Sequence, residues 1–206
     1  MEKKYILTDD VIYFNGHTLH RIKAVRDFDF VNAGDLGGYI ESEKNLDHDS
    51  DAWVTGDAWV SGDAVVSGAA RVTGDAWVFG DAVVSGAAVV SGAARVTGDA
   101  RVSGDARVTG AARVTGDAVV SGAARVTGDA RVSGDADFAV ISGFGRVFRT
   151  TTFFRCKDNL VRCQCGCFYG TVDEFRSKVR ETHGSSKYAK EYLMIADLME
   201  LHFKED

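Results

Sequence analysis

Proline is absent from the 206 residues of this chain. No turn can therefore draw on the fixed φ angle of a proline ring, and tight corners must be made in another way. The 23 glycines offer that way, because glycine adopts positive φ angles without a steric penalty. We therefore expect the turns of this protein to be built on glycine.

Cysteine is scarce and confined to one segment. All four cysteines lie between Cys156 and Cys167, so no disulfide framework runs through the rest of the chain. Secreted domains that depend on disulfides have a different distribution. We therefore expect a reducing compartment, the cytoplasm.

Long apolar runs and a strong charge imbalance are also missing. No stretch is apolar for long enough to span a membrane, and residues 1–5 lack the apolar core of a signal peptide. The formal net charge of −6 is modest, which argues against non-specific nucleic-acid binding by the whole surface. We expect neither a membrane nor bulk nucleic acid as the partner.

A six-residue repeat fills the middle of the chain. Three residue types recur at every sixth position without exception: valine from Val54 to Val132, alanine from Ala52 to Ala136 and glycine from Gly56 to Gly134. A strict period of this kind over residues 52–136 predicts a solenoid.

Each hexad reads as a short strand followed by a corner. In residues 64–69, AVVSGA, the alanine and the second valine are two apart, so both side chains face the same, inner side. Glycine then takes the corner. Three hexads make one triangular coil, and about five coils stack at roughly 4.8 Å. The pattern predicts a mainly β protein built on a single-stranded parallel β-helix.

This unit resembles the repeat of the hexapeptide-repeat, left-handed β-helix family. Residues 54–59, VTGDAW, match the aliphatic and small positions of that repeat but carry threonine at its second position. The left hand is implied by the resemblance alone. Residues 36–41, LGGYIE, stand in phase with the hexads. We therefore expect the solenoid to span residues 36–148.

Both ends of a solenoid carry unpaired strand edges and need caps. Within residues 1–35, Asn15-Gly16 separates two strand-like runs and predicts a β-hairpin cap. At the other end, Phe138 and Phe144 keep the hexad phase, and we expect them to plug the last coil.

Residues 149–206 are predicted to form a C-terminal α+β cap. Two strands are expected at 153–156 and 160–163, followed by a helix from Val172 to His183 and a second from about Lys187. The apolar stripe of the second helix has little core of its own to pack against. We therefore expect an oligomerisation element, and the resembled family favours a trimer.

Other segments resemble uncharacterised phage and prophage hexapeptide-repeat proteins: residues 36–43 (LGGYIESE), 165–168 (CGCF) and 187–193 (KYAKEYL). This resemblance implies a phage-linked origin, a place in the host-cell cytoplasm and no assigned activity. We hypothesise a non-catalytic binding or assembly protein. Its partner would be a host or phage protein, with a decoy or inhibitor role toward host defence, or a small anionic ligand that it sequesters.

Two alternatives stand beside this hypothesis. Many hexapeptide-repeat proteins are acyltransferases, which resemble one another in using a catalytic histidine beside a loop that leaves the coil. Here no histidine lies between His48 and His183, and the hexads have no insertion. We therefore predict no enzyme and no catalytic residue. The other alternative is a purely structural, oligomeric rod.

Outward positions eighteen residues apart stack into two lines: Trp59, Trp77, Arg95, Arg113 and Arg131 in one, and Trp53, Arg71, Val89, Arg107 and Arg125 in the other. Exposed tryptophans and arginines mark contacts with anions or acidic partners. The predicted ligand or partner surface is therefore Trp53, Trp59, Trp77, Arg71, Arg95, Arg113 and Arg131. The competing interpretation is a solvated, salt-bridged face whose tryptophans lie under the N-terminal hairpin.

The cysteines raise one metal hypothesis, a zinc site formed by Cys156, Cys163, Cys165 and Cys167. Their spacing differs from that of paired C-x-x-C knuckles. The interpretation we favour is that these thiols pack as small hydrophobic groups. No other cofactor is expected.

Overall fold

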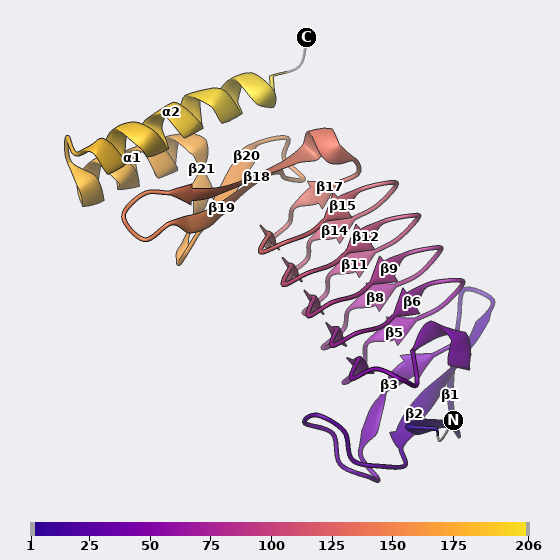
Figure 1. Cartoon of the computed structure of the whole chain (residues 1–206). Coiled ribbons are helices and arrows are strands. Elements are labelled where there is room, and N and C mark those ends of the chain that lie inside the picture. The colour runs from indigo at the N-terminus through magenta and orange to yellow at the C-terminus, as the bar shows by residue number, and fades with distance from the viewer. Residues whose placement is uncertain (1–2, 205–206) are drawn as a thin grey trace.

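The computed structural model describes residues 3–204 of the chain. It is an elongated molecule in which a regular solenoid separates an N-terminal β cap from a C-terminal α+β cap (Figure 1). The termini of the predicted caps, residues 1–2 and 205–206, lie outside the described residues. Of the described helices, none combines the length and apolarity that a membrane crossing needs.

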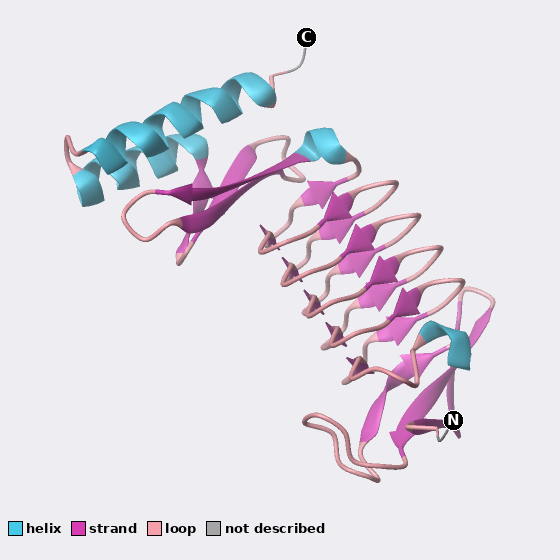
Figure 2. Ribbon diagram, in the orientation of Figure 1, coloured by secondary structure: helices cyan, strands magenta, loops and turns pink. Residues whose placement is uncertain are grey.

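The solenoid walls consist of two-residue strands, and Figure 2 shows them stacked coil upon coil. They are β4 (Trp53–Val54), β5 (Trp59–Val60), β6 (Val65–Val66), β7 (Arg71–Val72), β8 (Trp77–Val78), β9 (Val83–Val84), β10 (Val89–Val90), β11 (Arg95–Val96), β12 (Arg101–Val102), β13 (Arg107–Val108), β14 (Arg113–Val114), β15 (Val119–Val120), β16 (Arg125–Val126) and β17 (Arg131–Val132).

Three parallel walls result, and each strand pairs with the strand eighteen residues away, as Trp59 pairs with Trp77. Their orders are β5-β8-β11-β14-β17, β4-β7-β10-β13-β16 and β6-β9-β12-β15. The predicted three-walled parallel solenoid of about five coils is thereby confirmed. Its left hand remains an expectation from the family resemblance.

The interior of the coils is the alanine and valine of every hexad. Val96 and Ala94 are completely buried, and the same positions of the other hexads from Ala52 to Val132 are at most 1% exposed. The corner glycines from Gly56 to Gly128 have positive φ angles, for example 67° at Gly86. A Cβ atom there would lie 2.8 Å from the amide nitrogen of Gly104 in the next coil. Both the φ angle and the close stacking thus require glycine.

The N-terminal cap is the predicted hairpin. β1 (Tyr5–Phe14) pairs antiparallel with β2 (His17–Ala24), and the turn between them has positive φ angles at Asn15 and Gly16. β3 (Leu36–Ile40) pairs with β2 on one side and parallel with β5 on the other. The hairpin therefore continues one wall of the solenoid.

Two buried side chains complete the first coil. Within the solenoid, a backbone amide of one coil donates to a carbonyl of the next, as Trp53 does to Ala70. At the open end the Lys4 ammonium donates instead to the carbonyls of Ser50 and Ala52, at 2.7 and 2.8 Å. Asn45, in the short 3₁₀ helix η1 (Glu43–Asn45), donates to the carbonyls of Gly62 and Ala64, both at 2.9 Å. These donors replace a missing coil.

The C-terminal cap begins with the 3₁₀ helix η2 (Asp135–Asp137) and four antiparallel strands: β18 (Phe138–Phe144), β19 (Arg149–Arg155), β20 (Val161–Cys165) and β21 (Phe168–Thr171). The helices are α1 (Val172–His183) and α2 (Lys187–His202). The predicted bounds of the first helix are confirmed, and Thr171 and Glu174 form its capping box.

The plug of the last coil differs from the prediction. β18 pairs antiparallel with β19 and so leaves the coil before residue 148, and Phe144 is 42% exposed. Phe154 and Cys156, on and just after β19, are buried in the solenoid core instead, with Phe138 packed beside them. The aromatic residues at hexad phase were misleading because the chain turns into a hairpin after η2.

Candidate ligand site beside the N-terminal hairpin

Four side chains form a continuous stack on the wall that carries β5, β8 and β11. The rings of Trp59 and Trp77 are parallel to within 11°, with centroids 4.8 Å apart. Phe14, at the tip of the hairpin, contacts both rings with centroid distances of 4.7 and 4.8 Å. The Arg95 guanidinium lies 4.2 Å from the centre of Trp77 on the next coil. The parallel register therefore builds an aromatic platform that ends in a cation.

A hollow of about 300 Å³ opens beside this stack. It is lined by Phe14, Asn15, His17, Leu19, Trp59, Ser61, Trp77, Val78, Phe79 and Arg95. Phe79 and Phe14 are 42% and 38% exposed, whereas both tryptophans are half-buried. The lining contains no acidic residue, and Arg95 forms no ion pair with any described residue. The hollow is thus apolar and aromatic with a positive end.

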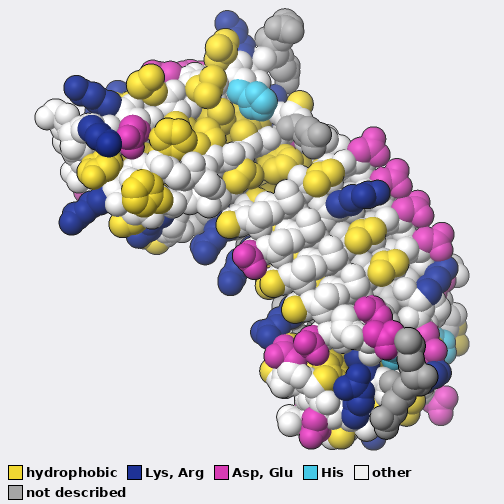
Figure 3. All heavy atoms as spheres, viewed as in Figure 1, with side chains coloured by type: hydrophobic (Ala, Val, Ile, Leu, Met, Phe, Trp, Pro, Cys, Tyr) yellow, Lys and Arg dark blue, Asp and Glu magenta, His cyan; other side chains and the backbone are white. Residues whose placement is uncertain are grey.

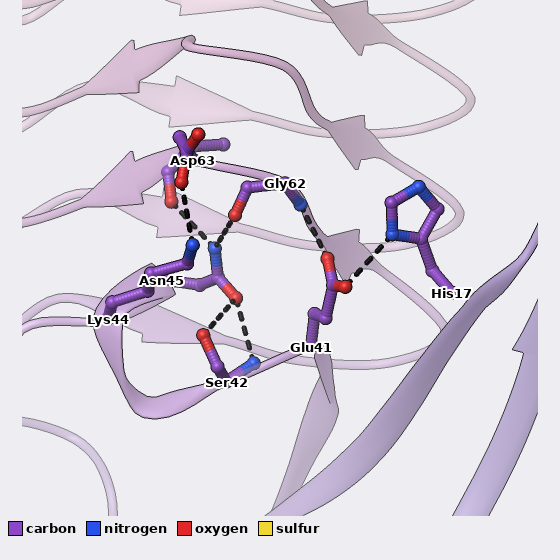
Figure 4. Close-up of polar contacts among 8 residues, drawn as sticks. His17, Glu41, Ser42, Lys44, Asn45, Gly62 and Asp63 are labelled. Atoms are coloured by element: carbon purple, nitrogen blue, oxygen red, sulfur yellow. Dashed lines mark hydrogen bonds and ion pairs between the residues drawn. The ribbon is translucent and has the colours of Figure 1, made fainter.

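His17, which is hydrogen-bonded to Glu41, forms the polar edge of the hollow. His17 Nδ1 lies 2.9 Å from Glu41 Oε1, and Glu41 Oε2 accepts a hydrogen bond of 2.7 Å from the amide of Gly62 (Figure 4). The hydrogen bond with His17 is the main cause that holds the pKa of Glu41 below its usual range, and the Gly62 amide adds to it. Glu41 therefore stays ionised and orients the His17 ring at the hollow.

Trp53 does not belong to the predicted surface, because it is buried. Its side chain is only 1% exposed and packs between Phe28 and Tyr5, with centroid distances of 5.3 and 6.2 Å. The segment that follows β2 covers it. The same segment contacts Arg71, whose guanidinium donates a hydrogen bond of 3.0 Å to the Asp29 carboxylate. The prediction that Trp53 lies on an open surface was wrong, and the covering by the N-terminal cap holds for this tryptophan.

The arginines of the predicted surface do not lie together. Arg113 and Arg131 continue the wall of Arg95 in register and are exposed, but they lie beyond the hollow. Arg71 belongs, with Trp53, to a different wall of the solenoid. The two predicted lines therefore occupy two faces and do not make one patch.

The sequence reasoning missed Phe14, His17 and Phe79, which line the hollow, and Glu41, which holds His17 from outside the lining. Phe79 carried a signal, since it is the one residue from Thr55 to Ser133 that breaks the Ser/Thr position of the hexad. Phe14 and His17 flank the Asn15-Gly16 turn, but the sequence does not say over which wall the hairpin folds.

His48, the histidine nearest the hexads, has a packing role. Its ring stacks on Tyr5 with a centroid distance of 4.1 Å, and its Nδ1 accepts a 3.3 Å hydrogen bond from the amide of Lys4. Burial lowers the pKa of His48 and favours its neutral form.

The cysteines divide between two cores. Cys156 is buried in the solenoid core and Cys163 in the core of the C-terminal cap, and burial raises the pKa of both thiols. Cys165 is half-buried and Cys167 exposed. Among residues 3–204, no three His, Cys, Asp or Glu side chains gather to hold a metal ion. The arrangement brings no tetrahedral thiolate set together.

The comparison with known families agrees with the fold. A family model described as the YdcK beta-solenoid repeat matches residues 100–116, which include β12, β13 and β14. No curated protein matches the chain. The coils and this match define the chain as a β-solenoid repeat protein.

Proposed function

We propose that this protein is a non-catalytic binding protein that holds a planar, anionic ligand in the hollow beside Trp59 and Trp77. The observation that carries the proposal is the stack of Phe14, Trp59, Trp77 and Arg95, half open to solvent at a hollow of about 300 Å³. Partly exposed aromatic side chains of this kind are typical of contact sites.

The lining selects the chemistry of the ligand. Phe79 and the tryptophan rings offer apolar and π surface, which suits a planar ring. Arg95 carries a charge that no described acid neutralises, and its guanidinium donors match phosphate or carboxylate oxygens. A nucleoside monophosphate combines a planar ring and an anion in a volume suited to this hollow.

The wider role that we propose follows the phage resemblance of residues 36–43, 165–168 and 187–193. In it, a left-handed hexapeptide-repeat protein in the host cytoplasm sequesters an anionic ligand, or occupies a host defence component as a decoy. The hollow would be the capture site in either case.

The test is titration calorimetry with AMP and GMP, and with adenosine as the uncharged comparison. We expect the nucleotides to bind with a stoichiometry near one and adenosine to bind at least about tenfold more weakly, as loss of a charge-assisted contact predicts. Arg95→Gln should remove this difference. Arg101→Gln, which removes an exposed arginine from another wall, should change nothing. Equal binding by Arg95→Gln and the wild type would contradict the proposal.

A second candidate, an acyltransferase-like or hydrolytic activity, is favoured by the His17–Glu41 pair. A histidine oriented by a carboxylate is the usual arrangement of a general base. If this candidate holds, the protein consumes acetyl-CoA in the presence of an acceptor alcohol or amine, and His17→Gln abolishes the reaction while leaving the fold intact. The non-catalytic proposal predicts no turnover in either protein.

A further inference from the structure

The C-terminal cap, which lies at the opposite end of the molecule from the N-terminal hairpin (Figure 1), contains a cavity of about 350 Å³. It lies between α1, the loop joining β18 to β19, and the turn joining β20 to β21. The walls are largely apolar and include Phe168, Phe175, Val179 and Tyr192. The cavity is therefore suited to an apolar body.

The mouth of this cavity is basic. Arg146 lines it from the loop and Arg149 from the start of β19. Lys178 and His183 line it from α1, and no acidic residue is among the lining side chains. Lys178 pairs with Glu181 at 3.0 Å, but neither arginine forms an ion pair within residues 3–204. Figure 3 shows basic side chains around apolar ones on this cap. Two uncompensated guanidinium groups beside an apolar cavity favour an anion.

The loop that carries Arg146 and leads into Arg149 is fixed in place. The amide of Gly145 donates to Glu191 Oε2 on α2 at 3.0 Å, and the Tyr192 hydroxyl lies 3.4 Å from the carbonyl of Phe144. Gly145 has a φ angle of 73°, and an added Cβ would collide with the Tyr192 hydroxyl. An added Cβ at Gly166 would likewise collide with the Arg149 guanidinium. The cavity and its basic mouth are therefore held by the surrounding structure rather than left to a free loop.

We propose that this cavity binds a small amphipathic carboxylate, with the apolar body between α1 and the sheet and the carboxylate at Arg146 and Arg149. An apolar body of roughly ten carbon atoms suits a cavity of this size. The site is independent of the aromatic hollow, since the two share no lining residue.

Cys167 provides a local reporter. It is exposed and lines the cavity together with the half-buried Cys165, whereas Cys156 and Cys163 are buried. A bound carboxylate should therefore slow the reaction of the Cys167 thiol with a thiol reagent, and Cys167→Ser should remove that signal.

The test uses decanoate, decanol and acetate in titration calorimetry with the full-length protein. We expect decanoate to bind with a stoichiometry near one, acetate not to bind, and decanol to bind at least about tenfold more weakly than decanoate. The double variant Arg146→Gln/Arg149→Gln should reduce decanoate affinity by about tenfold or more and should not affect decanol. Arg101→Gln is the matched control.

A second experiment fills the cavity with a larger side chain. Thr182 lines the cavity and is exposed, so Thr182→Trp should block decanoate binding without unfolding the protein, as circular dichroism would check. Decanoate binding that persists in Thr182→Trp, or that is equal to decanol binding, would overturn the proposal. Trp77→Leu should leave decanoate binding unchanged, which separates this site from the aromatic hollow.

Discussion

At the residue scale, the proposed ligand site includes a departure from the repeat. Tryptophan, valine or arginine stands at the outward position before the buried valine of each hexad, and only Phe79 replaces Ser or Thr after that valine. Trp59 and Trp77 meet because eighteen-residue stacking brings successive coils into register, and Phe79 lies two residues after Trp77 at the same hollow. The tryptophan line was predictable from periodicity. The sequence could not predict that Phe14 packs on this line or that the N-terminal cap buries Trp53. Both depend on how the non-repetitive N-terminal segment folds back over the solenoid.

Phe79→Ser restores the repeat and tests whether this departure serves binding. The side chain is 42% exposed, so its removal should change the free energy of unfolding by less than about 0.5 kcal/mol. Nucleotide affinity should fall, because part of the π surface of the hollow is lost. Chemical denaturation and calorimetry measure the two quantities on the same sample. A variant that binds as the wild type does would remove Phe79 from the site.

Lys4 gives the chain a predictable pH dependence. Burial lowers the pKa of Lys4 to about 8, against the opposing effects of Asp47 and Asp51. Between this pKa and the ordinary value of 10.5, the unfolded state binds more protons than the folded state. The free energy of unfolding should therefore rise with pH across this window.

The measurement compares urea unfolding of the wild type and Lys4→Met at pH 7.5 and pH 9.5. The first pH lies about half a unit below the pKa of Lys4 in the folded state, and the second lies between its folded and ordinary pKa values. Stability of the wild type relative to Lys4→Met should increase at the higher pH, since methionine does not titrate. Parallel changes in the two proteins would show that Lys4 keeps its proton throughout.

At the scale of elements, the hexad coil was almost fully predictable and the caps were predictable in part. The spacing of Ala and Val defines the buried face, and the glycine defines the corner. The hairpin at Asn15-Gly16 and the helix after Thr171 follow from local turn and capping chemistry. The departure of β18 from the coil was not predictable, because Phe138 keeps both the period and the apolar character of the hexads.

Val96 tests the coil interior. Its side chain is completely buried among alanines and valines, so Val96→Asp should unfold the protein by burying an unpaired carboxylate. Arg95→Asp places the same residue one position earlier, at an outward position, and should remain folded. Thermal unfolding followed by circular dichroism separates the two. A folded Val96→Asp protein would contradict the assignment of the inner face.

At the scale of the whole molecule, α2 leaves an apolar stripe in solvent. Met194, Leu198 and Leu201 are 71%, 54% and 69% exposed and follow one another at helical spacing. The proposed homo-oligomer, with a trimer favoured by family resemblance, would cover this stripe with a second copy of α2. The solenoid would then act as a rigid spacer between this assembly end and the aromatic hollow.

Light scattering coupled to size-exclusion chromatography measures this association. The wild type should elute with a mass above that of one 22.2 kDa chain, and Met194→Lys/Leu198→Lys should reduce the mass to the monomer. The exposed positions of both residues make it safe to substitute them without loss of the fold. A wild type that is monomeric at micromolar concentration would exclude the oligomer.

The most direct measurement of the binding account uses Trp53→Phe, in which Trp59 and Trp77 are the remaining tryptophans. Acrylamide should quench their emission in the free protein, because both rings are half-buried beside the open hollow. Saturating AMP should protect them from quenching, and Arg95→Gln should abolish the protection. Tryptophans that acrylamide cannot reach in the free protein, or that AMP leaves equally accessible, would contradict the central claim that this hollow is the ligand site.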